Sequence, residues 1–213
     1  MRNKKVIALL AIVILAGASY VLGWSSVFTV SAVEFKGTNK YLPERVKVGE
    51  KLARVEPRAV EATYEKFDFI GNAKVSRNWL TGKVTIEITT RTPIALYNNQ
   101  AIDDSGKAFA ISGQMPTSLP KIEAANGEAA VAAVDFFTAL PDEIKSGLVV
   151  LKVRSTGAYV LEVNLSGRNV EVRWGMPRDN ALKAKVYKAL LAQPENAKIK
   201  RMDLSAPHAP LVK

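Results

Sequence analysis

The sequence predicts an α+β protein made of an N-terminal transmembrane helix, a small α/β domain and a second mixed β domain with an antiparallel sheet and amphipathic helices. Three observations predict this class. A long uncharged apolar run opens the chain. Segments that alternate apolar and polar residues follow in two groups, and each group is accompanied by stretches with helical spacing of their apolar residues. Strands and helices grouped in this way are typical of α+β folds.

The transmembrane helix is predicted over residues 6–24, which contain no charged side chain and follow a cationic tail of residues 1–5. A helix of this length extends about 28 Å, close to the ~30 Å thickness of a bilayer core. Tyr20 and Trp24 stand where an aromatic anchor at the outer interface belongs. The run is therefore long enough to cross a membrane once.

The cations ahead of this run predict its orientation, because positively charged segments stay in the cytoplasm. The chain is thus predicted as a single-pass protein of the cell membrane, with its N-terminus cytoplasmic and its C-terminus extracytoplasmic. The alternative is a cleaved signal peptide, since Ala16-Gly17-Ala18 resembles a small-residue cleavage site. The apolar cores of such peptides usually span about 7–15 residues, which favours a retained anchor here.

Composition excludes several kinds of function. The 213-residue chain is 48% apolar with ten prolines, which favours folded domains. It has no cysteine, so disulfides, thiolate catalysis and cysteine-ligated metals are excluded. Its one histidine, His208, cannot form a multi-histidine metal site. The net charge of +10 is expected to face anionic lipid, an anionic wall or an acidic partner, and not nucleic acid, because of the predicted location. A solvated lysine-rich surface explains the charge equally well.

The first domain is predicted over residues 29–97. Val33 and Phe35 share one face of a strand, and Pro57 stands at the first position of a helix that continues to about Phe69. The apolar stripe of that helix is expected to consist of Val60, Tyr64 and Phe67. Residues 73–90 alternate on both sides of Thr81-Gly82 and predict an antiparallel hairpin. We expect the helix to cover one face of the resulting sheet, with Trp79 in the same core.

The second domain is predicted over residues 98–213. Its helices are expected over residues 128–140, with Val131, Val134 and Phe137 inward, and over residues 177–192. The second helix is expected to turn Leu182, Val186, Ala189 and Leu190 inward and Lys183, Lys185 and Lys188 outward or sideways. Three consecutive strands are predicted over residues 148–153, 159–165 and 170–174. Extended terminal segments are predicted over residues 198–204 and 209–212.

Candidate catalytic groups have simpler interpretations. Asp103 and Asp104 are adjacent carboxylates, but the Ser105-Gly106 that follows them is typical of a turn. Asp142-Glu143 follow a proline and have the same interpretation. No nucleophile elbow, phosphate-binding loop or metal-ligand spacing occurs in the sequence. We therefore predict no enzyme, no cofactor and no small-molecule substrate.

Short motifs occur in a fixed order along the chain. In the first domain they are Ala73-Lys74-Val75-Ser76-Arg77-Asn78-Trp79, Val84-Thr85-Ile86-Glu87-Ile88 and Arg91-Thr92-Pro93-Ile94-Ala95. In the second they are Ile102-Asp103-Asp104-Ser105-Gly106, Leu119-Pro120, Trp174-Gly175, Lys183-Ala184-Lys185 and Met202-Asp203-Leu204-Ser205-Ala206-Pro207. Together with the anchor, this order resembles the FtsQ/DivIB family of bacterial cell-division proteins. The departures are Leu80 in place of a usual proline, a short segment over residues 37–49, and Ser205-Ala206 where some relatives carry arginine and tyrosine.

The resemblance implies a POTRA domain followed by the C-terminal β domain of that family. It implies a non-enzymatic scaffold of the divisome, concentrated at the division septum, that links FtsB-like and FtsL-like proteins and other divisome membrane proteins to septal wall synthesis. The family's last strand is an open edge that receives a strand from FtsB, through main-chain groups that any partner strand can use. The residues implied to bind the partner are Met202, Leu204, Ser205, Ala206, His208, Ala209 and Leu211.

Two other functions are compatible with parts of the sequence. A membrane-anchored POTRA module of a secretion or assembly system is the main alternative, although such modules usually occur in tandem arrays ahead of a barrel. A wall-active enzyme needs a catalytic constellation that the sequence lacks.

Overall fold

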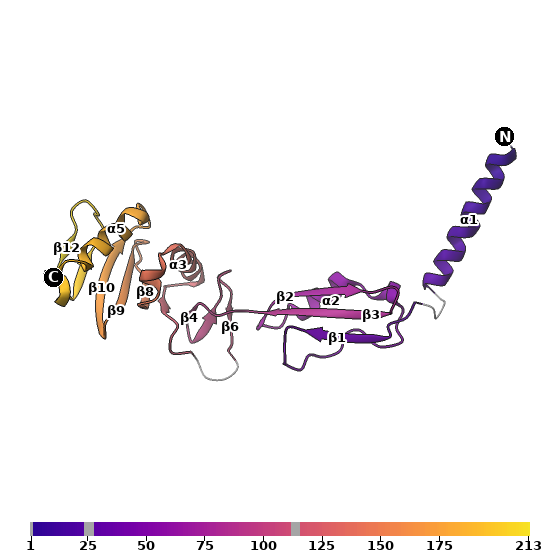
Figure 1. Ribbon diagram of the computed structural model, residues 1–213, viewed down its shortest axis with the longest axis horizontal. Coiled ribbons are helices and arrows are strands. Elements are labelled where there is room, and N and C mark those ends of the chain that lie inside the picture. Colours follow the sequence, from indigo (N-terminus) through magenta and orange to yellow (C-terminus); the bar gives the residue numbers. More distant parts are fainter. Residues whose placement is uncertain (1, 24–27, 112–115) are drawn as a thin grey trace. The chain divides into compact units, whose positions relative to one another are not determined.

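The computed structural model describes residues 2–23, 28–111 and 116–213. The chain forms two compact units, Met1–Arg91 and Thr92–Lys213 (Figure 1). The predicted boundary after residue 97 is corrected, because β4 (Ala95–Tyr97) pairs with strands of the second unit. Backbone pairing of these three residues therefore assigns them to the larger sheet.

The first helix, α1, spans Arg2–Gly23 and includes the cationic residues that were predicted as a separate tail. Lysine and arginine are good helix formers, so nothing in that segment delays the start of the helix. None of the helices in the described residues is both long and apolar enough to cross a membrane, which corrects the transmembrane helix predicted over residues 6–24. Trp24 lies outside the described residues.

The sheet of the first unit has the strand order β1-β3-β2, with β1 at Ala32–Lys36, β2 at Ile70–Arg77 and β3 at Lys83–Thr90. Strand β1 is parallel to β3, and β2 is antiparallel to it. The alternation predicted for the hairpin is confirmed, since the buried side chains are Ala73, Val75, Val84, Ile86 and Ile88. The turn closes at Gly82, whose φ of +73° suits a residue without a side chain.

Helix α2 (Pro57–Tyr64) covers this sheet and also protects its β2 edge. The backbone N–H of Val75 donates to Glu61 Oε1 at 2.8 Å, and that of Ala73 donates to Glu65 Oε1 at 3.2 Å. The carboxylates thus satisfy N–H groups that an open edge would leave for another chain. A short 3₁₀ helix, η1 (Leu52–Arg54), is held by the Arg77 guanidinium, which donates to the carbonyls of Leu52 and Val55.

Two details of the first unit differ from the prediction. Helix α2 ends at Tyr64, because the N–H of Phe67 turns back to the carbonyl of Tyr64 and closes a tighter turn. Phe67 is therefore half-buried beyond the helix, whereas Tyr64 is fully buried. Trp79 is 38% exposed in the hairpin turn, against Phe28 at 6.0 Å between ring centroids, and does not belong to the buried core.

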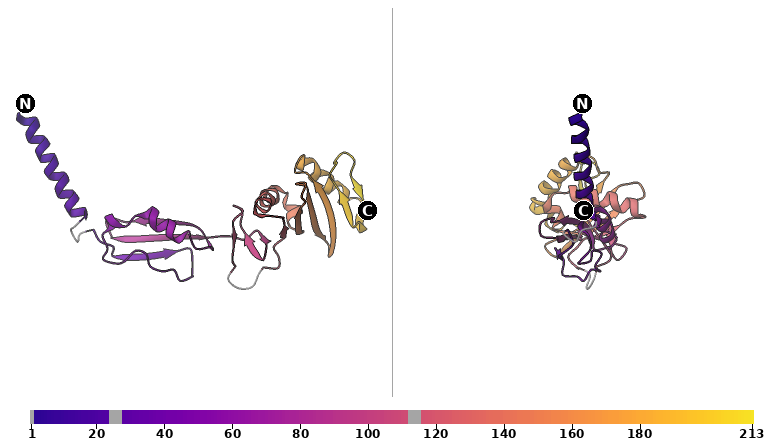
Figure 2. Two further views of the ribbon diagram at one scale, coloured as in Figure 1. Left: turned by 180° about the vertical axis from the view of Figure 1, so that it is seen from behind. Right: turned by 90° about the vertical axis from the view of Figure 1, so that its right-hand side faces the viewer.

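The second unit contains, within the described residues, a sheet of nine strands in the order β12-β11-β10-β9-β8-β7-β4-β5-β6 (Figures 1 and 2). Its remaining strands are β5 (Gln100–Ile102), β6 (Ala108–Phe109), β7 (Lys121–Glu123), β8 (Leu148–Val153), β9 (Tyr159–Leu165), β10 (Arg168–Gly175), β11 (Arg201–Asp203) and β12 (Leu211–Val212). Strands β8, β9 and β10 confirm the three predicted consecutive strands, and they pair antiparallel. The pairs β4–β7, β7–β8 and β10–β11 are parallel.

The helices of this unit are α3 (Gly127–Ala139), α4 (Asp142–Lys145), α5 (Asn180–Leu191) and the 3₁₀ helix η2 (Pro194–Lys198). The side chain of Asn126 caps α3 by accepting from the N–H of Ala129 at 2.9 Å. The buried face of α3 is Ala130, Ala133, Val134 and Phe136. The inward positions predicted for Val134 and Phe137 are confirmed, since Val134 is buried and Phe137 packs half-buried against the core, whereas Val131 is 39% exposed.

Helix α5 also differs from its predicted orientation. Lys183 is buried, with 2% of its surface exposed, and its ammonium donates to the carbonyls of Trp174 at 2.7 Å and Met176 at 2.8 Å. Burial lowers the pKa of Lys183, while the charge of Asp179 raises it. Tyr187 is buried on the same face and Ala189 is exposed. The ammonium is tolerated inside because two carbonyls at the end of β10 receive its hydrogen bonds.

We predict that the first unit is far more sensitive to Tyr64 than to the neighbouring Lys66. Tyr64 is fully buried and its hydroxyl donates to the carbonyl of Pro43 at 2.9 Å. Tyr64→Ala should lower the free energy of unfolding by about 3–5 kcal/mol, as truncation of a large buried ring does. Lys66→Ala, on the exposed side, is the matched control. Equal unfolding midpoints in denaturant for the two variants would contradict this packing.

Candidate functional site: the terminal edge of the large sheet

The candidate site is the edge of the second unit formed by β10, β11 and β12, which we call the terminal edge. Strand β11 pairs in parallel with β10, and Glu171, Val172 and Arg173 face Arg201, Met202 and Asp203. The chain then leaves the sheet over residues 204–210 and returns as β12, antiparallel to β11. In Figures 1 and 2 the yellow C-terminal segment lies beside β10 at this end of the sheet.

Strand β12 covers the side of β11 that the sequence predicted to be open. The N–H of Arg201 donates to the carbonyl of Lys213 at 3.0 Å, and the N–H of Lys213 donates to the carbonyl of Arg201 at 2.9 Å. Val212 faces Met202 in the next position of the ladder. In an antiparallel pair, residues alternate between bonding inward and bonding outward, so the N–H and C=O of Val212 point away from β11. The outermost strand therefore offers one residue with both groups directed outward.

The alternation of side chains divides the terminal edge into two faces. Met202 and Leu204 are buried in the core, with no measurable exposure. Arg201, Asp203 and Leu211 belong to the opposite face, where Leu211 is 65% exposed. A partner can therefore contact the side chains of Arg201, Asp203 and Leu211 directly. It cannot reach those of Met202 and Leu204.

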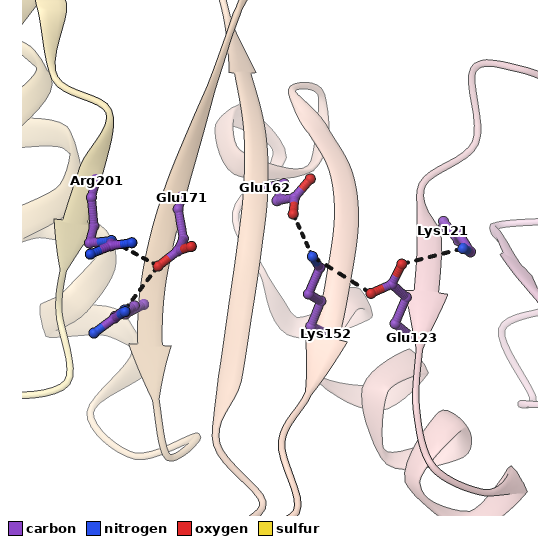
Figure 3. A network of polar contacts seen from close by, with 7 residues as sticks. Lys121, Glu123, Lys152, Glu162, Glu171 and Arg201 are labelled. Atoms are coloured by element: carbon purple, nitrogen blue, oxygen red, sulfur yellow. Dashed lines mark hydrogen bonds and ion pairs between the residues drawn. The ribbon is translucent and has the colours of Figure 1, made fainter.

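The exposed face carries two groups of ion pairs, some within a strand and some between neighbouring strands. Glu171 Oε1 accepts from Arg173 Nε at 2.9 Å and lies 3.0 Å from Arg201 Nε. Farther along the sheet, Lys152 Nζ lies 2.6 Å from Glu162 Oε1 and 3.7 Å from Glu123 Oε2, which completes the row with Lys121 (Figure 3). Figure 3 shows these side chains in front of the strands, with helices behind the sheet. The row therefore lies on the face that the helices leave open.

A shallow hollow of about 100 Å³ opens at the terminal edge, lined by Arg173, Arg201, Asp203, Leu211 and Lys213. The lining contains three cationic residues and one carboxylate, and the backbone N–H of Ser205 donates to that carboxylate at 2.9 Å. Since Glu171 pairs with Arg173 and Arg201, the three cations of the lining face two carboxylates, Glu171 and Asp203. The small positive excess beside one exposed leucine suits an acidic side chain better than a basic one. Among the described residues, no group of three or more acidic or histidine side chains is placed to hold a metal ion.

The structure separates the residues that the sequence analysis assigned to partner binding. Met202 and Leu204 are core residues, so their assignment as contacts is corrected: alternation in β11 turns them toward the helices. Ser205, Ala206, His208 and Ala209 are exposed in the loop over residues 204–210, and Leu211 is exposed on β12. The site residues that sequence reasoning missed are Arg173, Arg201, Val212 and Lys213. A signal was present for two of them, because Arg173 and Arg201 alternate with apolar residues in their strands.

Asp103 has the turn role that the sequence predicted, whereas Asp142 and Glu143 lie in the first turn of α4. Asp103 Oδ1 accepts from the N–H groups of Ser105 and Lys107 at 3.1 and 2.9 Å, and from the hydroxyl of Ser105 at 2.6 Å. Gly106 follows with a φ of +78°. The carboxylate of Asp103 therefore organises a turn.

We predict that Glu171 stabilises the folded chain above, but not below, its titration range. The hydrogen bond from Arg173, aided by Arg201, lowers the pKa of Glu171 from its ordinary value of 4.5, while burial opposes the shift. A carboxyl with a lower pKa in the folded state stabilises that state above about pH 4.5 and loses this effect as the pH falls. Glu171→Gln should therefore cost roughly 0.2–1 kcal/mol at pH 7 and progressively less toward pH 3.

The measurement is the free energy of unfolding of the wild type and the variant at several pH values, with Glu195→Gln on the exposed surface of η2 as control. A cost for Glu171→Gln that is the same at pH 7 and pH 3 would contradict the ion pairs.

Comparison with known proteins identifies relatives of the whole chain. It is 29% identical over 236 aligned residues to the cell division protein FtsQ of Streptomyces collinus, which covers 99% of this chain and 87% of that protein. It is 30% identical over 183 residues to the cell division protein FtsQ of Streptomyces griseus, covering 78% of this chain and 85% of that protein. A similarity with 17% identity and a TM-score of 0.35 links 51% of the chain to 97% of a solved chain, the major extracytoplasmic domain of the trans isomer of DivIB from Geobacillus stearothermophilus.

The family model for the C-terminal region of the cell division protein FtsQ/DivIB matches residues 95–205. The matched stretch begins at β4 and ends just after β11, so it contains most of the second unit and its parallel β10–β11 pair. The order of motifs in the sequence, the relatives and the family model agree: the chain belongs to the FtsQ/DivIB family of cell-division proteins.

Proposed function

We propose that this cell-division protein is a non-enzymatic scaffold of the divisome, and that its terminal edge holds FtsB-like and FtsL-like membrane proteins at the septum. The observation that carries the proposal is the outward N–H and C=O of Val212 beside the cationic hollow of Arg173, Arg201 and Lys213. An edge of this kind supplies main-chain hydrogen bonds to an incoming strand, and its side chains discriminate among strands.

The short β12 limits how much a partner gains from the backbone alone. Pro210 has no N–H, so Val212 is the residue of β12 whose N–H and C=O are both available to an added strand. The remaining affinity has to come from side chains. We propose that the side chains lining the hollow supply it. An acidic residue of the partner strand, placed over the hollow, faces Lys213 and competes with Glu171 for Arg201, while an apolar neighbour covers Leu211.

We also propose that α1 attaches the chain to the membrane and that both folded units lie outside the cytoplasm. The support is the surface of α1, where apolar side chains such as Ile7, Leu9 and Leu15 are 65–67% exposed. Apolar area of this extent is costly in water and favourable in lipid. The first unit, with its strand, helix and hairpin under one core, is proposed as the family's POTRA domain.

We predict that Val212→Pro weakens partner binding more than it weakens the fold. Proline removes the outward N–H of Val212, which makes no bond to β11, and leaves the inward bonds of Lys213 in place. Val212→Thr keeps the backbone and the strand preference, so it is the matched control. In a pull-down with an FtsB/FtsL-like pair, Val212→Pro should lower capture roughly threefold to tenfold, since one main-chain hydrogen bond is lost.

A thermal melt of each variant separates loss of binding from loss of folding. Removal of residues 210–213 should abolish capture as well, because it deletes the outermost strand. Undiminished capture by both altered proteins, with unchanged melting, would mean that the partner binds elsewhere.

We predict that α1 is sufficient to explain membrane attachment. The full chain should sediment with phospholipid vesicles, whereas a chain that begins at Phe28 should remain in solution, because it lacks the apolar surface of α1. Leu10→Lys combined with Ile14→Lys should weaken sedimentation, and Lys66→Ala should not. In cells, a reporter that is active only in the cytoplasm should be silent when fused after Lys213. A strong signal from that reporter would contradict the proposed extracytoplasmic position.

A further inference from the structure

The second unit contains an apolar cavity on the helix side of the sheet. It has a volume of about 280 Å³ and lies between α4, α5 and the end of β9. Its lining consists of Pro141, Glu143, Ile144, Leu165, Ala184, Lys185, Tyr187, Lys188 and Leu191. Most of these side chains are apolar, and none of them belongs to the terminal edge. The cavity is therefore a second surface, independent of the site proposed for the divisome partners.

One polar group in the lining has no partner. The Tyr187 side chain is 4% exposed, and among the described residues its hydroxyl makes no hydrogen bond. Burial raises the pKa of Tyr187 to about 12, so the hydroxyl carries its proton throughout the physiological range. A buried donor without an acceptor destabilises the folded protein. Because the hydroxyl is shielded from solvent, the part of Tyr187 that lines the cavity is its apolar ring, which adds to the apolar surface offered to an occupant.

The rim of the cavity is positively charged. Lys185 and Lys188 are exposed on α5, and the one acidic residue of the lining is Glu143. Lys188 Nζ lies 3.6 Å from Glu143 Oε1, but both side chains are more than two-thirds exposed, so water and salt weaken this pair. An acidic occupant gains from the two lysines without first breaking a strong ion pair.

The volume of about 280 Å³ is at the lower limit of small-molecule sites, which usually measure about 300–1,000 Å³. The choice of a peptide occupant therefore rests on the apolar lining with exposed lysines at its rim. A single large apolar side chain is the common anchor in cavities of this kind at protein interfaces. We propose that the cavity binds an acidic peptide segment of a partner protein, whose one leucine or aromatic side chain enters between α4 and α5 and whose carboxylates face Lys185 and Lys188.

The probe for this site is a fluorescein-labelled peptide of nine residues, with one phenylalanine or leucine among glutamates and alanines. Its fluorescence anisotropy is measured with the full chain, beside a peptide that carries lysines in place of the glutamates and one in which alanine replaces the anchor. The proposal expects saturable binding of the acidic peptide with the anchor and at least about tenfold weaker binding of the other two, because both the charge and the apolar anchor are needed.

Three variants locate the binding. Ala184→Leu fills the cavity and should abolish binding without lowering the melting temperature. Tyr187→Phe should raise the melting temperature, since it removes the unpaired hydroxyl, and should leave binding of the probe unchanged, because an occupant does not reach that hydroxyl. Lys185→Glu combined with Lys188→Glu should weaken binding of the acidic peptide roughly threefold to tenfold, whereas Lys198→Glu, exposed outside the cavity, should not weaken it.

Binding that is unaffected by Ala184→Leu, or that is equally strong for the peptide without an anchor, would overturn the proposal. So would saturation by phosphatidylglycerol vesicles that displaces the peptide, because the occupant would then be lipid. Val212→Pro should leave binding of this probe unchanged, which keeps the result separate from the test of the terminal edge.

Discussion

The position of the terminal edge depends on the burial of Trp174 at the end of β10. Its ring packs edge-on against Phe136 of α3 at 5.9 Å, and its indole N–H donates to Asn180 Oδ1 at 2.8 Å. Its carbonyl accepts from the ammonium of Lys183. One fully buried residue thus connects the strand to both long helices of the unit. Since β10 also pairs with β11, this packing fixes where the last strands can lie.

The residue after Trp174 extends the same constraint to the loop. Gly175 has a φ of +73°, and a side chain there would lie 3.0 Å from the Cα of Ser205. The loop that begins at Ser205 therefore rests directly on the end of β10, and only glycine permits this approach. A contact in the interior of the unit thus fixes the positions of the loop and of β12, although both lie at its surface. Trp174 and Gly175 therefore have a structural role at the terminal edge: Trp174 fixes the end of β10, and Gly175 lets the loop rest on it.

The sequence was sufficient to predict an element and its buried face where the local pattern of apolar residues agrees with the tertiary packing. Alternation in residues 84–88 and 159–165 predicted the strands and their buried faces, and the turn at Asp103 was recognisable from its residues. It was insufficient where a polar side chain is satisfied by distant backbone. Periodicity counts Lys183 as an outward residue, because the two carbonyls that receive its ammonium become neighbours only after folding. The return of β12 onto β11 is likewise non-local, so the two terminal segments were predicted as extended but their pairing with each other was not.

The same reasoning explains why the functional proposals fall at the edge and the cavity and not on the broad charged face. On that face Lys152 is bonded to Glu162, and Glu171 to Arg173 and Arg201, so a partner has to compete with bonds that the folded chain already makes. At the edge the N–H of Val212 points away from the sheet, so a new acceptor gains a hydrogen bond there without breaking one in the protein. The cavity instead offers apolar surface between α4 and α5, which an entering apolar side chain removes from water. An outward main-chain group thus favours association at the edge, and burial of apolar surface favours it in the cavity.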